Sequence, residues 1–139
     1  MDYRTTNNCV FSCVYHIVFC PKYRRRLLVD EVEVRLKVLI IETIASIDGA
    51  WIQELEIMPD HVHLLIEVSP KIAVKQVISR IKGASSRKLR EEFPHLKTRV
   101  PTLWTNSYFV SSVGGAPLEK VKDYIANQKR SQLDTDKMG

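Results

Sequence analysis

Two histidines separated by one residue are the side chains of this sequence best suited to bind a metal ion. His61 and His63 lie in a stretch whose alternating pattern over residues 63–68 predicts a strand. Because successive side chains of a strand point to opposite faces, both imidazoles share one face. The other face is a wholly apolar row that fixes the register, made up of Val62, Leu64, Ile66 and Val68. The alternative interpretation is a pair of surface or hydrogen-bonded histidines without a metal.

A tyrosine and a glutamine near the end of the chain could complete this site. Tyr124 and Gln128 are four residues apart in a predicted helix over 118–132, so they share one face of it. Two imidazoles and the Gln128 carbonyl oxygen form a mixed ligand set with open positions, which suits Mg²⁺ or Mn²⁺ at least as well as zinc. An amphipathic surface ring is the alternative interpretation of Tyr124.

Tyr124 is the candidate nucleophile of this site. A phenol is a poor nucleophile below its pKa of about 10, so its attack on a phosphate requires a metal ion. Such an attack would join the 5′ phosphate to the protein and release a 3′ hydroxyl. The phosphotyrosine would keep the bond energy for rejoining, and the sequence contains no Gly-rich phosphate loop. We therefore expect a divalent metal and no nucleotide cofactor.

Two cationic stretches are candidate contacts for a nucleic-acid backbone. The first surrounds one aromatic ring that could stack on a base, and it consists of Lys22, Tyr23, Arg24, Arg25 and Arg26. The second lies on a predicted helix and combines cations with hydroxyls, at Lys82, Ser85, Ser86, Arg87, Lys88 and Arg90. A solvated surface explains either stretch about as well.

The hydrophobic periodicity places these residues on alternating strands and helices. Strands are predicted over 10–20, 51–57, 61–68 and 103–113, the second and third joined as an antiparallel hairpin. One helix is predicted over 32–47, with Asp30 as N-cap and Gly49 as C-cap. A second begins at 69–70 and runs to 93, with a kink or a close approach possible at Gly83, and 94–101 is predicted to be a loop.

This order of elements predicts an α+β fold of the ferredoxin-like or RRM-like type. In that split βαβ plan an antiparallel sheet carries both helices on one face. The apolar row of the histidine strand belongs against the helices, so the histidines should lie on the open face. The glycine pair Gly114 and Gly115 predicts a hinge at 113–117, before the C-terminal helix that carries the tyrosine.

Composition restricts the class of protein further. The 139 residues, 45% of them hydrophobic, predict a single domain over 1–139. A net charge of +5 favours a polyanionic partner. Three cysteines without Cys-x-x-Cys spacing, Cys9, Cys13 and Cys20, indicate a reduced intracellular chain. Neither a membrane span nor a signal peptide is evident, so we expect a soluble cytoplasmic protein without a membrane partner.

The sequence resembles a known family, the single-tyrosine HUH transposases of small bacterial and archaeal insertion sequences (insertion sequence 200/605 type). The resemblance rests on six blocks in the right order, at residues 15–24, 58–65, 82–87, 103–108, 113–117 and 124–128. It implies a homodimer that cuts and rejoins single-stranded DNA at the hairpin-bearing ends of its element. It also implies that His61 and His63 bind the metal, that Tyr124 is the nucleophile and that Gln128 is the third ligand.

The resemblance further implies that the tyrosine helix can complete the active site of the partner subunit, with the glycine pair as a pivot. Base pairing within the DNA would choose the cleavage site. Three other hypotheses remain: a replication initiator or relaxase-type nickase with the same residues, a non-catalytic single-stranded nucleic-acid-binding protein, and a metal hydrolase. Only the first of these would form a covalent adduct with DNA.

Overall fold

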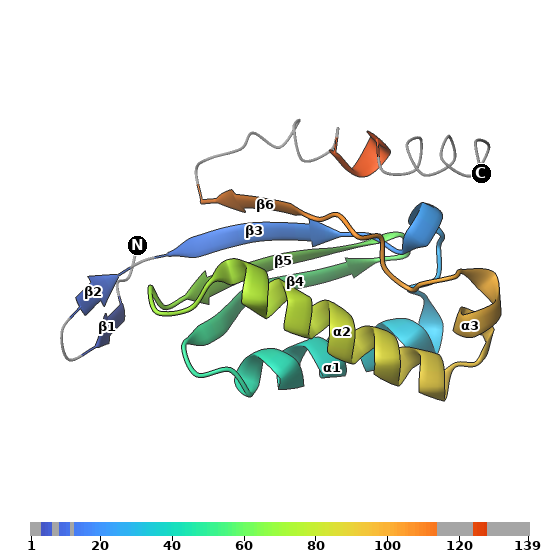
Figure 1. Cartoon of the computed structure of the whole chain (residues 1–139), viewed down its shortest axis with the longest axis horizontal. Coiled ribbons are helices and arrows are strands. Elements are labelled where there is room, and N and C mark those ends of the chain that lie inside the picture. Colours follow the sequence, from blue (N-terminus) through green and yellow to red (C-terminus); the bar gives the residue numbers. More distant parts are fainter. Residues whose placement is uncertain (1–3, 7–8, 12, 114–123, 128–139) are drawn as a thin grey trace.

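A four-stranded antiparallel sheet covered on one face by two helices forms the body of the molecule (Figure 1). The computed structural model describes residues 4–6, 9–11, 13–113 and 124–127. The strands follow the order β4-β5-β3-β6, and their bounds are Ala50–Met58 for β4, His61–Val68 for β5, Val14–Phe19 for β3 and Phe109–Ser112 for β6. Helices α1 (Asp30–Ala45) and α2 (Val74–Glu92) lie on the same side of the sheet. The predicted α+β plan is confirmed.

The core lies between the sheet and the two helices. The apolar row of β5 is at most 1% exposed at every position, from Val62 to Val68. It packs in one cluster with side chains of α1 such as Leu36 and Ile40, and of α2 such as Ile78 and Ile81. His61 and His63 therefore lie on the face that the helices leave open, as predicted.

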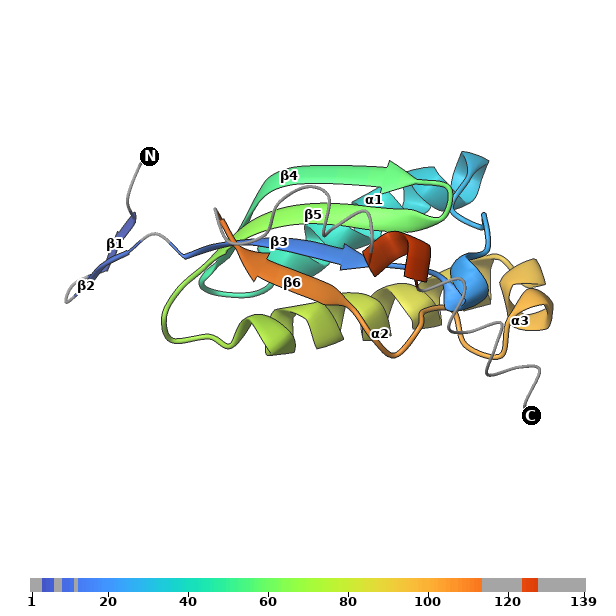
Figure 2. The same cartoon turned by 90° about the horizontal axis from the view of Figure 1, so that it is seen from above.

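The predicted strand over 10–20 is two strands. Residues Cys9–Phe11 form β2, which pairs with β1 (Arg4–Thr6) in a separate two-stranded sheet. From Val14 onward β3 pairs with β5 on one side and β6 on the other. Figure 2 shows the small sheet beyond the end of the large one. Both strands share one alternation, so the pattern could not reveal the change of partner.

Both ends of α1 differ from the sequence prediction. Asp30 is its first residue and Val29 occupies the N-cap, without a side-chain hydrogen bond. The helix ends at Ala45, and the Ser46 amide donates to carbonyls of the last turn. Gly49 lies beyond this end, in the turn before β4, where its φ of +101° requires a residue without a side chain.

Helix α2 departs from prediction at its start and at Gly83. Helix α2 begins at Val74 instead of 69–70, because Ser69 bonds through its amide to the Gly49 carbonyl and starts a turn. It is a single helix through Gly83, and nothing lies within 4 Å of a Cβ placed there. Neither the kink nor the close approach is present.

The segment after α2 was predicted as a loop and then a long strand. It contains a short helix, α3 (His95–Arg99), and the strand β6 covers only the last part of 103–113. Trp104 instead forms an isolated bridge with Pro21. Residues 124–127 are helical, which agrees with part of the predicted tyrosine helix. The rest of 118–132 and nearly all of the 113–117 hinge lie outside the described residues.

Candidate active site

The two histidines project onto the open face from the first and third residues of β5. Asp60, in the turn between β4 and β5, accepts a hydrogen bond from His61 Nδ1 at 2.8 Å. Because an ionised carboxylate can only accept, Nδ1 must carry the proton, and Nε2 of a neutral ring then keeps its lone pair. Metal-binding histidines commonly have this carboxylate partner, which fixes the ring and its tautomer. His61 therefore fits a metal ligand.

His63 also contacts a polar partner that fixes its ring. Its Nε2 lies 3.3 Å from Nδ1 of His16 on β3, and the two rings stack with their planes 10° apart. Burial and the neighbouring His16 lower the pKa of His63, while Glu56 and Glu54 on the adjacent strand oppose that shift. A lowered pKa keeps the imidazole neutral near pH 7, the form that can bind a metal.

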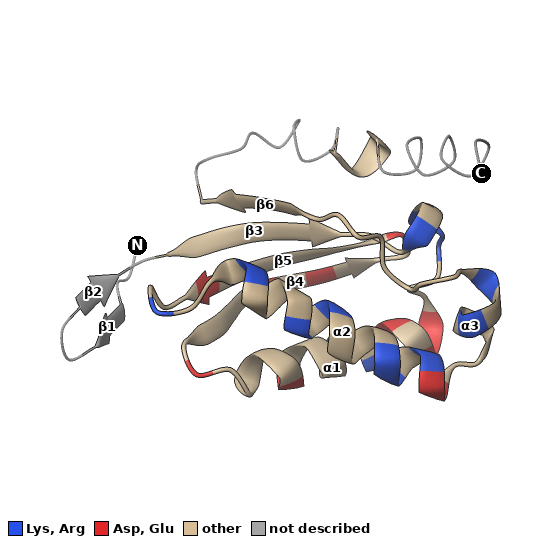
Figure 3. Ribbon diagram, in the orientation of Figure 1, with Lys and Arg blue, Asp and Glu red and all other residues tan. Residues whose placement is uncertain are grey.

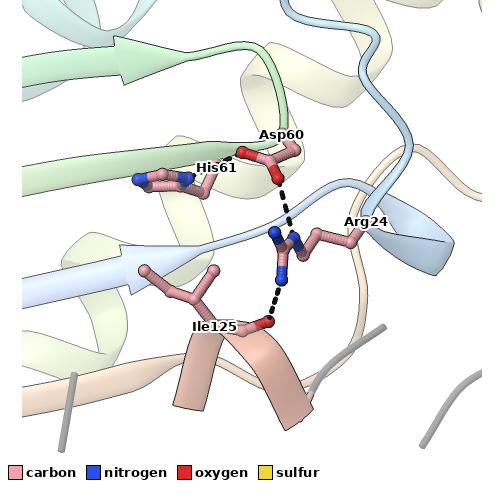
Figure 4. Close-up of polar contacts among 4 residues, drawn as sticks. All are labelled: Arg24, Asp60, His61 and Ile125. Atoms are coloured by element: carbon pink, nitrogen blue, oxygen red, sulfur yellow. Dashed lines mark hydrogen bonds and ion pairs between the residues drawn. The ribbon is translucent and has the colours of Figure 1, made fainter. Parts of the chain in front are cut away.

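Asp60 joins the histidine strand to two other parts of the chain (Figure 4). Arg24 Nε donates to its second carboxylate oxygen at 2.7 Å. Arg24 Nη1 donates to the carbonyl oxygen of Ile125 at 3.0 Å. Burial raises the pKa of the Asp60 carboxyl, but the hydrogen bonds from His61 and Arg24 and their charges outweigh it, so the net pKa is lowered. Asp60 is consequently an ion at neutral pH.

Tyr124 lies over the same face of the same chain as the histidines. Its ring packs against Phe109 of β6 at a centroid distance of 5.6 Å. In the sheet Phe109 is opposite Val18, and Val18 is opposite His63, so the three share one row on one face. With strands about 4.8 Å apart, two strand spacings place Phe109 roughly 10 Å from His63. The fold thus brings the tyrosine and the histidine pair together on one surface.

The hydroxyl of Tyr124 donates a hydrogen bond to Ser107 Oγ at 3.1 Å. Burial raises the pKa of the phenol, and the bond to Ser107 offsets this only in part. The neutral phenol is therefore favoured even more than in water. A nearby positive charge would lower this pKa again, because it stabilises the phenolate.

Acidic, histidine and cysteine side chains do not by themselves form a metal site in the described part of the chain. There, no group of three or more such residues could hold a metal ion. The predicted third ligand, Gln128, lies just outside the described residues. Residues 124–127, which precede it, are helical, and the Ile125 carbonyl accepts a hydrogen bond from Arg24.

The two cationic stretches lie in different layers of the molecule. Figure 3 shows Lys and Arg in the turn η1 (Lys22–Arg24) at one end of the sheet and along α2 on the helical layer. Arg25 and Arg26 are exposed beside η1, and Lys22 and Tyr23 are partly exposed. Arg87 and Lys88 are exposed on α2 and Ser86 is partly exposed. The first stretch adjoins the histidine face through the bond of Arg24 to Asp60.

Ser85 is wrongly placed among the candidate DNA contacts. Its residue is 1% exposed, and its hydroxyl donates to the Ile81 carbonyl at 2.6 Å. The same oxygen accepts from Trp104 Nε1 at 3.0 Å. Ser85 is four residues from both Ile81 and Leu89, so it belongs to the buried stripe of α2. That spacing was visible in the sequence and could have placed it correctly.

Lys82 is engaged with the protein backbone. Its Nζ donates to the Thr105 carbonyl at 2.6 Å and lies over the Tyr108 ring at 5.6 Å. Burial lowers the pKa of this amine. Since the segment after Thr105 carries Ser107, Lys82 holds the loop that bonds the Tyr124 hydroxyl.

Sequence reasoning did not assign Asp60, His16 or Ser107. Asp60 directly precedes His61, and a carboxylate beside a candidate metal histidine is a recognisable signal. His16 alternates with the core residues Ile17 and Phe19, which already placed it on the outer face. Ser107 offered no signal, because its contact with Tyr124 depends on the path of the chain between distant elements.

No helix among the described residues is both long and apolar enough to cross a membrane.

Comparison with known proteins identifies the relatives of this chain. A family model described as "Transposase IS200 like" matches residues 9–128. The chain is 36% identical over 121 residues to the ISDra2 transposase TnpA of Deinococcus radiodurans, covering 86% of each protein. It is 37% identical over 131 residues to the transposase for insertion sequence element IS200 of Salmonella typhimurium, covering 93% of this chain and 82% of that protein.

Two solved structures share the fold. A crystal structure of a candidate transposase from Deinococcus radiodurans R1 superposes with a TM-score of 0.80 at 35% identity, covering 90% of this chain and 97% of that one. A REP-associated tyrosine transposase superposes with a TM-score of 0.52 at 12% identity, covering 90% and 68%. The second likeness concerns the fold alone. Taken with the match over residues 9–128, the two transposase relatives show that this chain belongs to the IS200-like transposase family.

Proposed function

We propose that this transposase cuts and rejoins single-stranded DNA at hairpin-bearing ends of its element through a 5′-phosphotyrosine intermediate. The observation that carries the proposal is the position of Tyr124 on the same sheet face as His61 and His63. A packing role alone would account for the ring of Tyr124. It would not account for a carboxylate-paired histidine and a second histidine on that face.

In the proposed cleavage step the Tyr124 oxygen attacks the phosphorus of the scissile phosphodiester. A new bond forms between the phenolic oxygen and phosphorus, and the bond between phosphorus and the 3′ oxygen breaks. The phenolic proton leaves to solvent and the departing 3′ oxygen takes one up, so the products are a 5′-phosphotyrosine and a 3′ hydroxyl. In rejoining, a 3′ hydroxyl attacks the phosphotyrosine and restores the phenol.

His61, His63 and Gln128 are the proposed ligands of a Mg²⁺ or Mn²⁺ ion. The bond between His61 Nδ1 and Asp60 supports this, because it leaves Nε2 as the available ligand atom. When bound, the ion would polarise the phosphoryl oxygen and neutralise developing negative charge. Asp60 and His16 would hold the two imidazoles in place, and Ser107 would orient the phenol before DNA arrives.

The proposed substrate is a single-stranded DNA hairpin, and the proposed assembly is a homodimer. Exposed Arg25 and Arg26 beside the site, and Arg87 and Lys88 on α2, are the candidate backbone contacts. The REP-associated tyrosine transposase that shares the fold is itself bound to a REP hairpin. Sedimentation equilibrium of the purified chain tests the dimer, and a monomer at all micromolar concentrations would exclude it.

The test of the nucleophile uses labelled single-stranded oligonucleotides that cover the flanking ends of the element, with Mn²⁺. The wild-type protein should form an adduct that survives denaturing electrophoresis. Tyr124→Phe should form none while it still binds the hairpin, because the ring keeps its packing on Phe109. An adduct of undiminished yield in this variant would move the nucleophile elsewhere. Binding without any adduct in the wild type would favour a non-catalytic DNA-binding protein.

The test of the metal site uses His61→Ala, His63→Ala and Gln128→Ala. Both histidine variants should lose the adduct and Mn²⁺ binding measured by calorimetry, and the glutamine variant should show weaker binding and slower cleavage. His95→Ala is the matched control, since this exposed histidine lies on α3. Removal of the metal with EDTA should abolish the adduct and leave hairpin binding. Normal cleavage by the histidine variants at low Mn²⁺ would exclude the assignment.

A further inference from the structure

Arg24 makes two directed contacts that link separate parts of the chain. One guanidinium nitrogen donates to Asp60 beside the histidine strand, and another donates to the Ile125 carbonyl one residue after the tyrosine. Figure 4 shows the guanidinium between the two acceptors, with His61 on the far side of the carboxylate. The contacts join residues 36 and 101 positions away from Arg24. They are therefore tertiary contacts and not consequences of local structure.

The turn that carries Arg24 is held in an unusual conformation. Tyr23 and Arg24 both have positive φ, at 60° and 50°. Residues other than glycine rarely adopt this left-handed backbone conformation. Such residues cost on the order of 1–3 kcal/mol each and persist only when their surroundings impose them. Here the Lys22 amide bonds to the Leu103 carbonyl, and the Arg24 amide bonds to the Pro21 carbonyl. The turn thus aims the guanidinium at a defined point.

The charge of Arg24 is already satisfied within the protein. The Arg24 side chain is 26% exposed and that of Asp60 is 12% exposed, so their ion pair is largely removed from water. Asp60 uses its other oxygen for His61, which makes the carboxylate the common partner of the arginine and the histidine. Contact of Arg24 with a DNA phosphate would have to replace these bonds. Arg26 is exposed, so burial does not keep its guanidinium from a DNA phosphate.

We propose that Arg24 is a positioning residue, which seats the tyrosine segment at 124–127 against the histidine strand instead of contacting the DNA backbone. This inference rests on the proposed function of Tyr124. A guanidinium can bond two acceptors at once in a fixed plane, whereas an ammonium acts as a point charge. The two bonds from the Arg24 guanidinium, its fork, therefore set the distance between the helical segment that holds the nucleophile and the turn that orients His61.

Amide hydrogen exchange of the full chain without DNA or metal tests the seating of the segment directly. Arg24→Gln and Arg24→Lys should both speed exchange in the peptide that contains residues 124–127, because neither side chain reproduces the fork. Lys37→Gln is the matched control: it removes one positive charge from an exposed site on α1 and should leave this exchange unchanged. Thermal unfolding monitored in parallel identifies any variant that is globally unfolded at the working temperature.

Single-turnover adduct formation separates positioning from DNA contact. For Arg24→Lys, the maximal rate at saturating hairpin DNA should fall on the order of 10- to 100-fold, as expected when a nucleophile is displaced by about 1 Å. The DNA concentration that gives half the maximal rate should change less than about twofold, since the charge is kept. Arg26→Gln should show the other behaviour, a higher half-saturating concentration and a weaker salt dependence.

Two results would overturn the proposal. The first is unchanged exchange at 124–127 in both Arg24 variants. The second is an Arg24→Lys variant that keeps the wild-type maximal rate while Arg24→Gln only weakens DNA binding, which would make Arg24 a phosphate contact. If the wild-type protein forms no adduct, the proposed function fails, and the exchange comparison still decides whether Arg24 holds the segment.

Discussion

The hydrogen bond between Trp104 and Ser85 tests how helix α2 packs on the segment that carries Trp104. Trp104 Nε1 donates to Ser85 Oγ at 3.0 Å, and Ser85 Oγ donates to the Ile81 carbonyl at 2.6 Å. The two residues are 5% and 1% exposed. Ser85→Ala removes the acceptor of a buried indole N–H.

The magnitude follows from the loss of one partner in a buried hydrogen bond. Ser85→Ala should reduce the free energy of unfolding by about 1–3 kcal/mol, the cost of leaving a buried polar group unsatisfied. The neighbouring Ser86→Ala is the matched control, because that residue is partly exposed and lies outside the buried stripe of α2. A surface change of this kind should stay within about 0.5 kcal/mol.

Urea unfolding followed by far-ultraviolet circular dichroism measures the effect, with unchanged m-values as the check on two-state behaviour. In Trp104→Phe the indole N–H is absent, and the Ser85 hydroxyl keeps its bond to the Ile81 carbonyl. Adding Ser85→Ala to Trp104→Phe therefore leaves no indole N–H without an acceptor. The double variant should lose less free energy of unfolding than the sum of the two single losses. The expected coupling is about 1 kcal/mol. Hairpin binding by folded Ser85→Ala should equal that of the wild type. An equal loss in the Ser85 and Ser86 variants, or weaker DNA binding only in the former, would refute this reasoning.

Further predictions concern two glycines, a buried thiol and a surface cation. Gly49→Ala should destabilise the protein by about 1–3 kcal/mol, because φ is +101° and the added Cβ would lie 2.8 Å from Ile72 Cδ1. Gly83→Ala should stabilise the protein by about 0.5–1 kcal/mol. Urea unfolding that ranks the two variants in the opposite order would contradict both predictions. Burial raises the pKa of the Cys20 thiol to about 12, and the Asp60 charge adds to the shift. The folded state therefore keeps a proton that the unfolded chain loses near pH 9, so stability should fall as the pH rises from about 9 towards 12, by at most about 4 kcal/mol for this group. Cys20→Ala should show a smaller loss between pH 8 and pH 10.5, and identical losses would contradict the assignment. Arg26→Gln should weaken hairpin binding and reduce the slope of log affinity against log salt by about one, as measured by fluorescence anisotropy; the same affinity at every salt concentration would make Arg26 a merely solvated residue.

Local periodicity was sufficient for the body of the fold and for the orientation of the histidine strand. A strand has a period of two, so an apolar row from Val62 to Val68 leaves only one face for His61 and His63. Helical spacing likewise identified α1 and α2, because their buried positions repeat at three and four residues. The ends of elements were less well predicted, since they depend on which backbone groups find partners.

Sequence patterns were misleading where one pattern continued across a change of partner. The alternation from β2 into β3 is unbroken, although β2 pairs with β1 and β3 pairs with β5 and β6. Ser85 was grouped with its cationic neighbours in the chain. Its place in the helix assigns it to the core instead, where its hydroxyl meets Trp104.

The sequence alone determined which residue types share a strand face or a helix stripe, because these relations follow from the geometry of one element. Tertiary structure alone decided that Arg24 lies between Asp60 and Ile125, and that Ser107 accepts a bond from Tyr124. These contacts join segments far apart in the chain, and their geometry depends on the strand order β4-β5-β3-β6 and on the left-handed turn at Arg24. No pattern within a single helix or strand contains that information, since it arises only when the elements pack together.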